Sequence, residues 1–264
     1  MQLHADHSAR KSGSLTIVGL GPGRIEYMTG RSVEAIRDAE YIIGNDSYLS
    51  PLESLLGGKN IIRSSMGKEV DRAKQAIDLA QHHSVAIVSG GDAGVYGMAS
   101  IVLEIAEREK ANVHIEIIPG VTAANAAASR VGSPLSGDFA VISLSDLLTP
   151  LEVIEKRLDA VFSAGIPVVL YNPKSKGRPH NFALAMEHAR LYHKPETPVA
   201  IVKNALREGE KVIITTLGQV AHHDDDVDMH TTVIIGGDET RIWKEGHYVK
   251  GIITPRGYHR KYLY

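Results

Sequence analysis

Three glycine-containing turns are the segments of this sequence best suited to hold a small ligand. Each follows a short apolar run, and they lie at residues 19–23, 89–94 and 119–123. Turns with few side chains allow backbone amides to approach a ligand closely. Ligands of open α/β sheets bind beyond the carboxyl ends of the strands, so three such turns can converge on one site. Asp92 is the only charged residue between positions 88 and 100.

The first of these turns departs from the dinucleotide-binding fingerprint. Pro22 and Gly23 break its G-x-G-x-x-G spacing, and no acidic residue ends the next strand near position 45. The P-loop lysine, the G-x-S-x-G frame of a serine nucleophile and cysteine are all absent from the sequence. A nicotinamide-dependent oxidoreductase is therefore disfavoured, and the chemistry must come largely from a bound cosubstrate and from positioning.

Three cations follow another apolar run, within residues 172–180. Lys174, Lys176 and Arg178 occupy alternate positions there. Arginine offers a planar fork to a carboxylate and lysine a point charge, so this segment indicates recognition of substrate carboxylates. A solvated loop is the alternative interpretation, because most runs of charge are exposed.

Residues 222–230 are dense in histidine and aspartate. Their composition suits a metal ion, but adjacent polar residues in a loop rarely give the fixed geometry that metal ligation needs. We therefore predict a solvated loop and no metal site in this segment.

Alternating apolar runs and amphipathic helices predict the scaffold that positions these segments. In the first half, strands are predicted at residues 15–18, 41–44, 60–63, 85–88 and 113–118. In the second half, they are predicted at residues 139–144, 167–171, 198–203, 210–216 and 231–235, the last of which closes the series. Helices between these strands imply mainly parallel sheets covered on both faces. The connection from Lys203 to Glu210 is too short for a helical crossover, so the second half is expected to include antiparallel strands.

The bulk composition limits the classes of partner. Lysine and arginine number 29 against 31 acidic residues in a chain of 264, so no overall field attracts nucleic acid or an anionic membrane. No run approaches the roughly 20 apolar residues of a membrane span, and residues 1–13 lack the apolar core of a signal peptide. We expect a cytoplasmic protein that binds neither nucleic acid nor membrane. Its predicted parts are a tail at 1–13, α/β domains at 14–119 and 120–257, and a second tail at 258–264.

Taken as a set, these motifs resemble those of the tetrapyrrole methylases, the S-adenosylmethionine-dependent enzymes that methylate the corrin ring in cobalamin biosynthesis. The resemblance extends from about Ser14 to Gly236 and rests on motifs at residues 18–23, 89–92, 119–124, 171–172 and 203–205. Within the family, the chain is similar to the branch that acts at carbon 17 of precorrin-3B or cobalt-precorrin-3. The residues typical of that branch lie at 91–99, 141–150 and 170–176.

The resemblance implies an α/β fold of two αβα domains with mixed sheets, a cofactor cleft between the domains, and a homodimer that acts on a tetrapyrrole. It implies S-adenosyl-L-methionine as cosubstrate and S-adenosyl-L-homocysteine as product. Carried onto this chain, the implied cofactor contacts are Pro22, Gly91, Asp92, Val95, Thr122, Ala123, Asn172 and Ala205. Ala93 replaces the proline of the general family motif, which is normal for this branch, whereas Arg24, Gly137 and Leu151 depart from the expected pattern.

The implied reaction is methylation of carbon 17 together with contraction of the macrocycle. Contraction needs proton movement, for which the candidate groups are Asp92, Tyr96 and Asp146. Each of them can instead cap a turn or satisfy backbone amides. The three cations of residues 172–180 are our hypothesis for pairing with the peripheral carboxylates. A methylase that acts at another ring position, and a tetrapyrrole-binding protein without catalysis, are the alternative functions.

Overall fold

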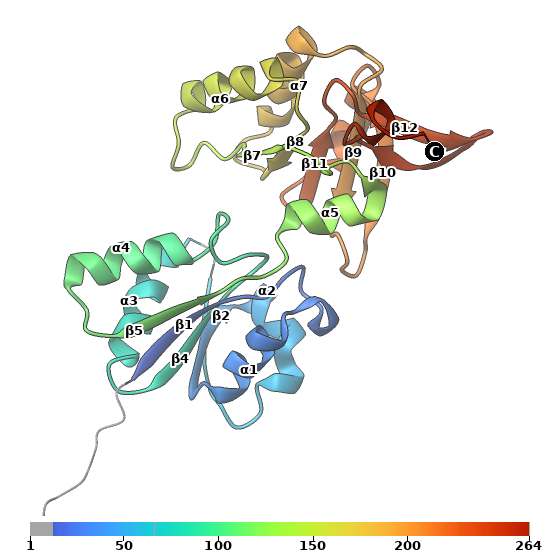
Figure 1. The fold of residues 1–264 in the computed structure, drawn as a ribbon. Helices are drawn as coiled ribbons and strands as arrows, with labels where there is room; N and C mark the ends of the chain where they lie inside the picture. The colour runs from blue at the N-terminus through green and yellow to red at the C-terminus, as the bar shows by residue number, and fades with distance from the viewer. Residues whose placement is uncertain (1–12, 66, 264) are drawn as a thin grey trace, which may run out of the picture. The chain divides into compact units, whose positions relative to one another are not determined.

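The computed structural model describes residues 13–65 and 67–263, and Figure 1 shows its ribbon. The chain divides after Thr122 into two compact units. Each unit has its own central sheet and its own apolar cores. The domain boundary predicted between residues 119 and 120 lies just before this point.

The first unit contains a five-stranded parallel sheet with the strand order β3-β2-β4-β1-β5. The strands are β1 (Ser14–Gly19), β2 (Tyr41–Asn45), β3 (Asn60–Ser64), β4 (Ser84–Ser89) and β5 (His114–Ile118). β1 lies between β4 and β5, so that Val18 is paired with Val88 on one side and Ile118 on the other. Because these three strands are adjacent and parallel, the turns that follow them leave the same edge of the sheet.

Helices cover both faces of this sheet (Figure 1). They are α1 (Gly30–Asp38), α2 (Asp46–Leu49), α3 (Glu69–Leu79) and α4 (Ala99–Glu109), with the short 3-10 helices η1 (Ile25–Tyr27) and η2 (Ser50–Leu55). Alternate residues of β1 enter opposite cores, since Ile17 packs with α3 and α4 while Val18 packs with α1 and η2. Thr29 caps α1 by accepting a hydrogen bond from the backbone N–H of Ser32 at 3.0 Å.

The second unit contains a mixed five-stranded sheet with the order β10-β9-β11-β8-β7. Its strands are β7 (Ala140–Ser143), β8 (Val168–Tyr171), β9 (Pro198–Lys203), β10 (Lys211–Thr216) and β11 (Thr231–Ile235). Its helices are α5 (Ala123–Val131), α6 (Leu151–Ser163), α7 (Asn181–Tyr192) and the 3-10 helix η3 (Val220–Asp226). α6 and α7 cover one face and α5 the other. β9 and β10 are antiparallel, as the short connection between them predicts.

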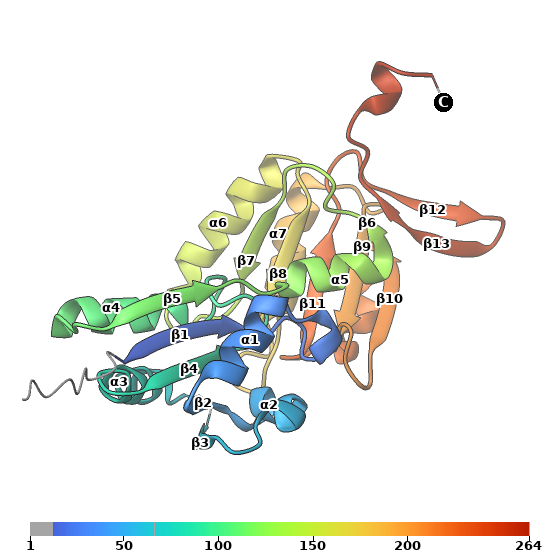
Figure 2. The ribbon, with the colours of Figure 1, turned by 60° about the horizontal axis from the view of Figure 1, so that its bottom comes forward.

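A third, three-stranded sheet corrects the expectation that residues 231–235 are the last strand. β12 (Arg241–Glu245) and β13 (Tyr248–Ile253) form a hairpin around Gly246, and β13 pairs with the short strand β6 (Gly132–Ser133) (Figure 2). A short 3-10 helix, η4 (Tyr258–Arg260), follows within the predicted tail. The hairpin was missed because most of its residues are exposed and charged residues interrupt its apolar ones, so that it lacks a long apolar run. In the described part of the chain, no helix has the length and apolar character needed to cross a bilayer.

His193 is a buried polar group in the core of the second unit. Its ring meets Phe162 edge-on with 5.6 Å between the centroids, and Nδ1 lies 3.7 Å from Asp238 Oδ1. Nε2 has no hydrogen-bond partner among the described residues. Burial lowers the pKa of His193, and the charge of Asp238 only partly opposes this effect.

The stability of the second unit should therefore fall as the pH drops below about 6.5, the ordinary pKa of histidine. In that range the unfolded chain binds a proton on His193 that the native state does not, which favours unfolding by at most about 1.4 kcal/mol per pH unit. Urea unfolding at pH 7.5 and pH 5.5 should show a larger loss for the wild type than for His193→Phe. The exposed His247 offers a control, because His247→Gln should lose as much stability as the wild type. Parallel losses in wild type and His193→Phe would contradict this account.

Candidate functional site

The turns that follow β4, β1 and β5 pack backbone against backbone in the first unit. Gly21 and Gly91 exchange two hydrogen bonds, each N–H donating to the carbonyl of the other at 2.9 Å. A Cβ added to Gly120 would lie 2.2 Å from the carbonyl oxygen of Gly91, and one added to Gly19 would lie 2.6 Å from the backbone nitrogen of Gly120. These contacts leave no room for side chains, so the three turns converge as the sequence predicts.

The carboxylate of Asp92 connects the second turn to the third. Oδ1 accepts a hydrogen bond from the backbone N–H of Gly94 at 2.8 Å, and Oδ2 accepts one from Gly120 at 3.0 Å. Both oxygens are therefore engaged by backbone amides. This is the role of satisfying amides that the sequence left open for Asp92, and each oxygen keeps a second lone pair that can still accept a proton or a hydrogen bond.

The segment after Asp92 contains two further candidate site residues, and both have exposed side chains. Val95 and Tyr96 are exposed, and Tyr96 adopts a left-handed conformation with φ of 52°. The base of the segment is closed where Ser89 Oγ accepts a hydrogen bond from the backbone N–H of Met98 at 3.3 Å. Left-handed residues other than glycine are uncommon and gather at functional sites. The loop therefore presents Val95 and Tyr96 from a constrained base.

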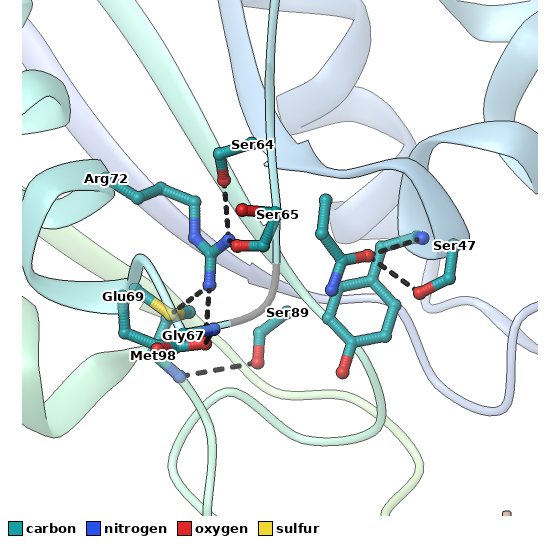
Figure 3. A network of polar contacts seen from close by, with 10 residues as sticks. Ser47, Ser64, Ser65, Gly67, Glu69, Arg72, Ser89 and Met98 are labelled. Carbon is teal, nitrogen blue, oxygen red and sulfur yellow. Dashed lines mark hydrogen bonds and ion pairs between the residues drawn. The ribbon is translucent and has the colours of Figure 1, made fainter.

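A buried arginine contacts the end of the same loop (Figure 3). Arg72 donates from Nη1 to Ser64 Oγ at 2.6 Å and from Nη2 to Met98 Sδ at 3.4 Å. Nη2 also lies 3.4 Å from Glu69 Oε1, whereas Nε has no partner among the described residues. The guanidinium thus joins the end of β3 to the start of α4.

Sequence reasoning missed Arg72, although a signal for it was present. Arg72 precedes Ala76 by four residues, and it lies on the buried face of α3 with Ala73, Ala76 and Ile77. A charge on the apolar face of an amphipathic helix indicates a buried, partnered group.

In the second unit, hydrogen bonds hold the ends of β7 and β8 together. Asn172 is left-handed with φ of 51°, and its Nδ2 donates to Ser143 Oγ at 2.9 Å. The hydroxyl of Tyr171 accepts a hydrogen bond from the backbone N–H of Ala124 at 2.6 Å, in the first turn of α5. The start of α5, which includes Ala123, is thus attached to the strand end that carries Asn172.

The turn after β9 places Ala205 between two left-handed residues. Asn204 and Leu206 have φ of 49° and 61°. Glu210 accepts a hydrogen bond from the backbone N–H of Leu206 at 2.6 Å and pairs with Arg130 of α5 at 3.0 Å. Ala205 and Ala123 pack against the same apolar cluster. Ala123 and Asn172 therefore lie at joined ends of α5 and β8, whereas the turn that carries Ala205 is joined to Arg130 near the end of α5.

The three cations predicted to meet substrate differ in their surroundings. Lys174 pairs with the carboxylate of Asp224 and also donates to the backbone oxygen of Asp224 at 3.0 Å. Arg178 donates from Nη2 to Met229 Sδ at 2.8 Å. Lys176 is exposed at the tip of a tight turn closed by hydrogen bonds between Ser175 and Arg178. Lys176 and Arg178 are therefore better placed than Lys174 to meet a carboxylate of a substrate.

The His/Asp-rich segment forms η3 and binds lysines at the ends of strands. Asp226 pairs with Lys211 at 2.6 Å, and Asp228 pairs with Lys203 at 2.6 Å. The hydrogen bonds from Lys211 and then from His223 lower the pKa of Asp226. Within residues 13–65 and 67–263, no three metal-ligating side chains gather in one place. Three of the aspartates, those at 224, 226 and 228, act instead as ion-pair partners.

Asp146, the third acid–base candidate, is exposed in the loop that follows β7. It belongs to the second unit, whereas Asp92 and Tyr96 belong to the first. Pro22 and Thr122 also lie in the first unit, in the turns after β1 and β5, where Pro22 is buried and Thr122 half-buried. The roles assigned to these residues stay predictions.

Comparisons with known proteins show what this chain is similar to. A model of the family Tetrapyrrole (Corrin/Porphyrin) Methylases matches residues 14–221. The cobalamin biosynthesis protein CbiHC of Archaeoglobus fulgidus is 46% identical over 251 residues, which are 95% of this chain and 54% of that protein. The probable cobalt-factor III C(17)-methyltransferase of Salmonella typhimurium is 43% identical over 245 residues, which are 92% of this chain and 99% of that protein.

A solved structure agrees with these matches. The crystal structure of the methyltransferase CobJ aligns with a TM-score of 0.86 and 34% identity, over 92% of this chain and 100% of that one. The chain thus spans about half the length of the Archaeoglobus relative and nearly all of the Salmonella relative. The predicted α/β fold class is confirmed.

Proposed function

Because the chain belongs to the tetrapyrrole methylase family, we propose that it methylates carbon 17 of a corrin precursor from S-adenosylmethionine and contracts the macrocycle in the same active site. The acceptor is precorrin-3B or its cobalt-containing counterpart. The match to a probable cobalt-factor III C(17)-methyltransferase over nearly the whole of that protein supports this assignment. The family resemblance drawn from the motifs is confirmed by the family model.

The observation that carries the proposal is the packing of the three glycine turns at the ends of β4, β1 and β5. The turns contact one another through backbone atoms, and Asp92 is the only charge between residues 88 and 100. That segment offers no cation to a phosphate, so it suits a nucleoside without phosphates, such as S-adenosylmethionine. We assign the donor to Pro22, Gly91, Asp92, Val95 and Thr122 in the first unit. Ala123, Asn172 and Ala205 complete the set from the second unit.

S-adenosylmethionine supplies a methyl group that its sulfonium already activates. The protein then has to align donor and acceptor and to exclude water, which lowers the barrier without a protein nucleophile. The sequence agrees with this requirement, since it contains no cysteine and no serine-nucleophile frame. Asp92, Tyr96 and Asp146 stay our candidates for the proton movement that contraction needs. The homodimer and the placement of the cofactor stay predictions.

The experiment that tests this function is a single-turnover assay with isotopically labelled S-adenosylmethionine. Precorrin-3B and cobalt-factor III are supplied in separate reactions, and the products are analysed by mass spectrometry and NMR. Label at carbon 17 of a contracted ring supports the proposal and identifies the acceptor. Label at another ring carbon shows that the protein methylates a different position of the ring. Bound pigment without any transfer of label shows a tetrapyrrole-binding protein.

Removing the two cations best placed to contact the substrate should weaken the binding of the tetrapyrrole and leave the binding of S-adenosylhomocysteine unchanged. Lys176→Ala combined with Arg178→Ala should raise the KM for the tetrapyrrole about tenfold or more, because two charge-assisted contacts to carboxylates are lost. The Kd for S-adenosylhomocysteine, measured by calorimetry, should not change. Lys211→Ala is the control, since Lys211 already pairs with Asp226. Equal weakening of both ligands would contradict this division of roles.

A further inference from the structure

Two adjacent leucines project from the loop between β7 and α6. Leu147 is 80% exposed and Leu148 is 92% exposed. Single exposed apolar residues are common on protein surfaces, but an adjacent pair that is almost fully solvated needs an explanation.

Hydrogen bonds and burial fix the residues at the start of this loop, and these residues set the direction in which the chain leads to the leucines. Leu144 is buried in the core, and its backbone N–H donates to the carbonyl of Tyr171 at 2.9 Å. The backbone N–H of Ser145 donates to Ser143 Oγ at 3.3 Å. No glycine occurs in residues 144–150, and Pro150 restrains the backbone of the residue before it.

The same loop is hydrogen-bonded to the segment that carries the exposed Lys176 and the half-buried Arg178. Asn172, at the start of that segment, donates to Ser143 Oγ, and Asn181, directly after it, donates to the carbonyl of Leu144 at 2.8 Å. β7 and β8 are parallel neighbours, so both loops leave the same edge of the sheet. An apolar projection and a cationic turn therefore lie on adjacent, mutually bonded loops.

We propose that Leu147 and Leu148 form an apolar contact for a face of the tetrapyrrole macrocycle, while Lys176 and Arg178 meet its peripheral carboxylates. This inference rests on the proposed function. A tetrapyrrole has broad apolar faces and an anionic rim, and the two adjacent loops offer the complementary surfaces. Asp146, the residue before Leu147, is then brought to the edge of the bound ring, where its carboxylate can exchange a proton with the substrate.

The test compares variants of the full chain in binding cobalt-factor III and S-adenosylhomocysteine. Leu147→Ser combined with Leu148→Ser should raise the Kd for cobalt-factor III by about tenfold per leucine, because apolar contact area is lost. The Kd for S-adenosylhomocysteine and the melting temperature should stay as in the wild type. Leu147→Met combined with Leu148→Met should restore the affinity for cobalt-factor III.

Leu191→Ser is the matched control, since Leu191 is 73% exposed and lies near the end of α7, the helix that leads away from the cationic segment. Wild-type affinity in the Leu147/Leu148 serine variant would overturn the inference while the proposed function stands. If light scattering shows that the serine variant dissociates from a dimer, and this dissociation accounts for its weaker affinity, the inference is also overturned. The two leucines would then contact a second copy of the chain. A wild type that neither binds nor methylates the tetrapyrrole would overturn the proposed function, and the inference with it.

Discussion

Asp92→Ala should weaken the binding of S-adenosylhomocysteine by about 100-fold. The substitution removes two charge-assisted hydrogen bonds, to the amides of Gly94 and Gly120, that hold the second and third turns in register. Each is worth about 1.5 kcal/mol or more, and together they correspond to about two orders of magnitude in Kd. Isothermal calorimetry measures this loss directly.

The variant Asp92→Asn distinguishes two roles of Asp92: holding the second and third turns together, and transferring a proton. An asparagine side chain has one acceptor oxygen, so it can accept from one of the two amides while its NH2 group faces the other. We therefore expect a Kd for S-adenosylhomocysteine between those of the wild type and Asp92→Ala. Asp146→Asn, in the second unit, should leave this Kd unchanged. If Asp92→Asn kept the wild-type Kd and lost only turnover, Asp92 would be an acid–base group and not a tie between turns.

Gly120→Ala should lower the unfolding free energy of the protein by about 3 kcal/mol or more and abolish binding of S-adenosylhomocysteine. The added Cβ would lie 2.2 Å from the oxygen of Gly91 and 2.8 Å from the carbonyl carbon of Gly19. Both are backbone atoms, so the clash can be relieved only by separating the three turns. Urea unfolding and calorimetry measure the two effects.

Gly30→Ala is the matched control for this substitution. Gly30 is the first residue of α1, and a Cβ added there meets no atom within 4 Å. Stability should be equal or slightly higher, because alanine favours the helix over glycine. Wild-type stability and affinity in Gly120→Ala would show that the turns are not packed as tightly as the backbone contacts require.

Local signals were sufficient for the elements that carry the site in the first unit. Apolar runs ending in glycine predicted β1, β4 and the turns after them, because a strand buried on both faces and a side-chain-free turn are visible in neighbouring residues. The hairpin of β12 and β13 was not predictable, because its strands are mostly exposed and gain their order from pairing with each other and with β6.

The roles of individual charged residues could not be decided in this way. Asp92 looked equally suited to catalysis and to binding amides until Gly120, 28 residues away, was found beside it. Lys174 looked like a substrate contact, but its partner is Asp224, 50 residues away. The position of Arg72 on the apolar face of α3 indicated burial, but only the structure showed its partner Met98, 26 residues away.

The sequence by itself determined the α/β class, the three glycine turns and the family, because these depend on residue types at short spacing. Only the tertiary structure decided which groups meet at the ends of the strands. The order β4-β1-β5 brings together turns that are about 30 to 100 residues apart, and no local propensity contains that order. It is the pairing of strands that turns three separate glycine motifs into one surface.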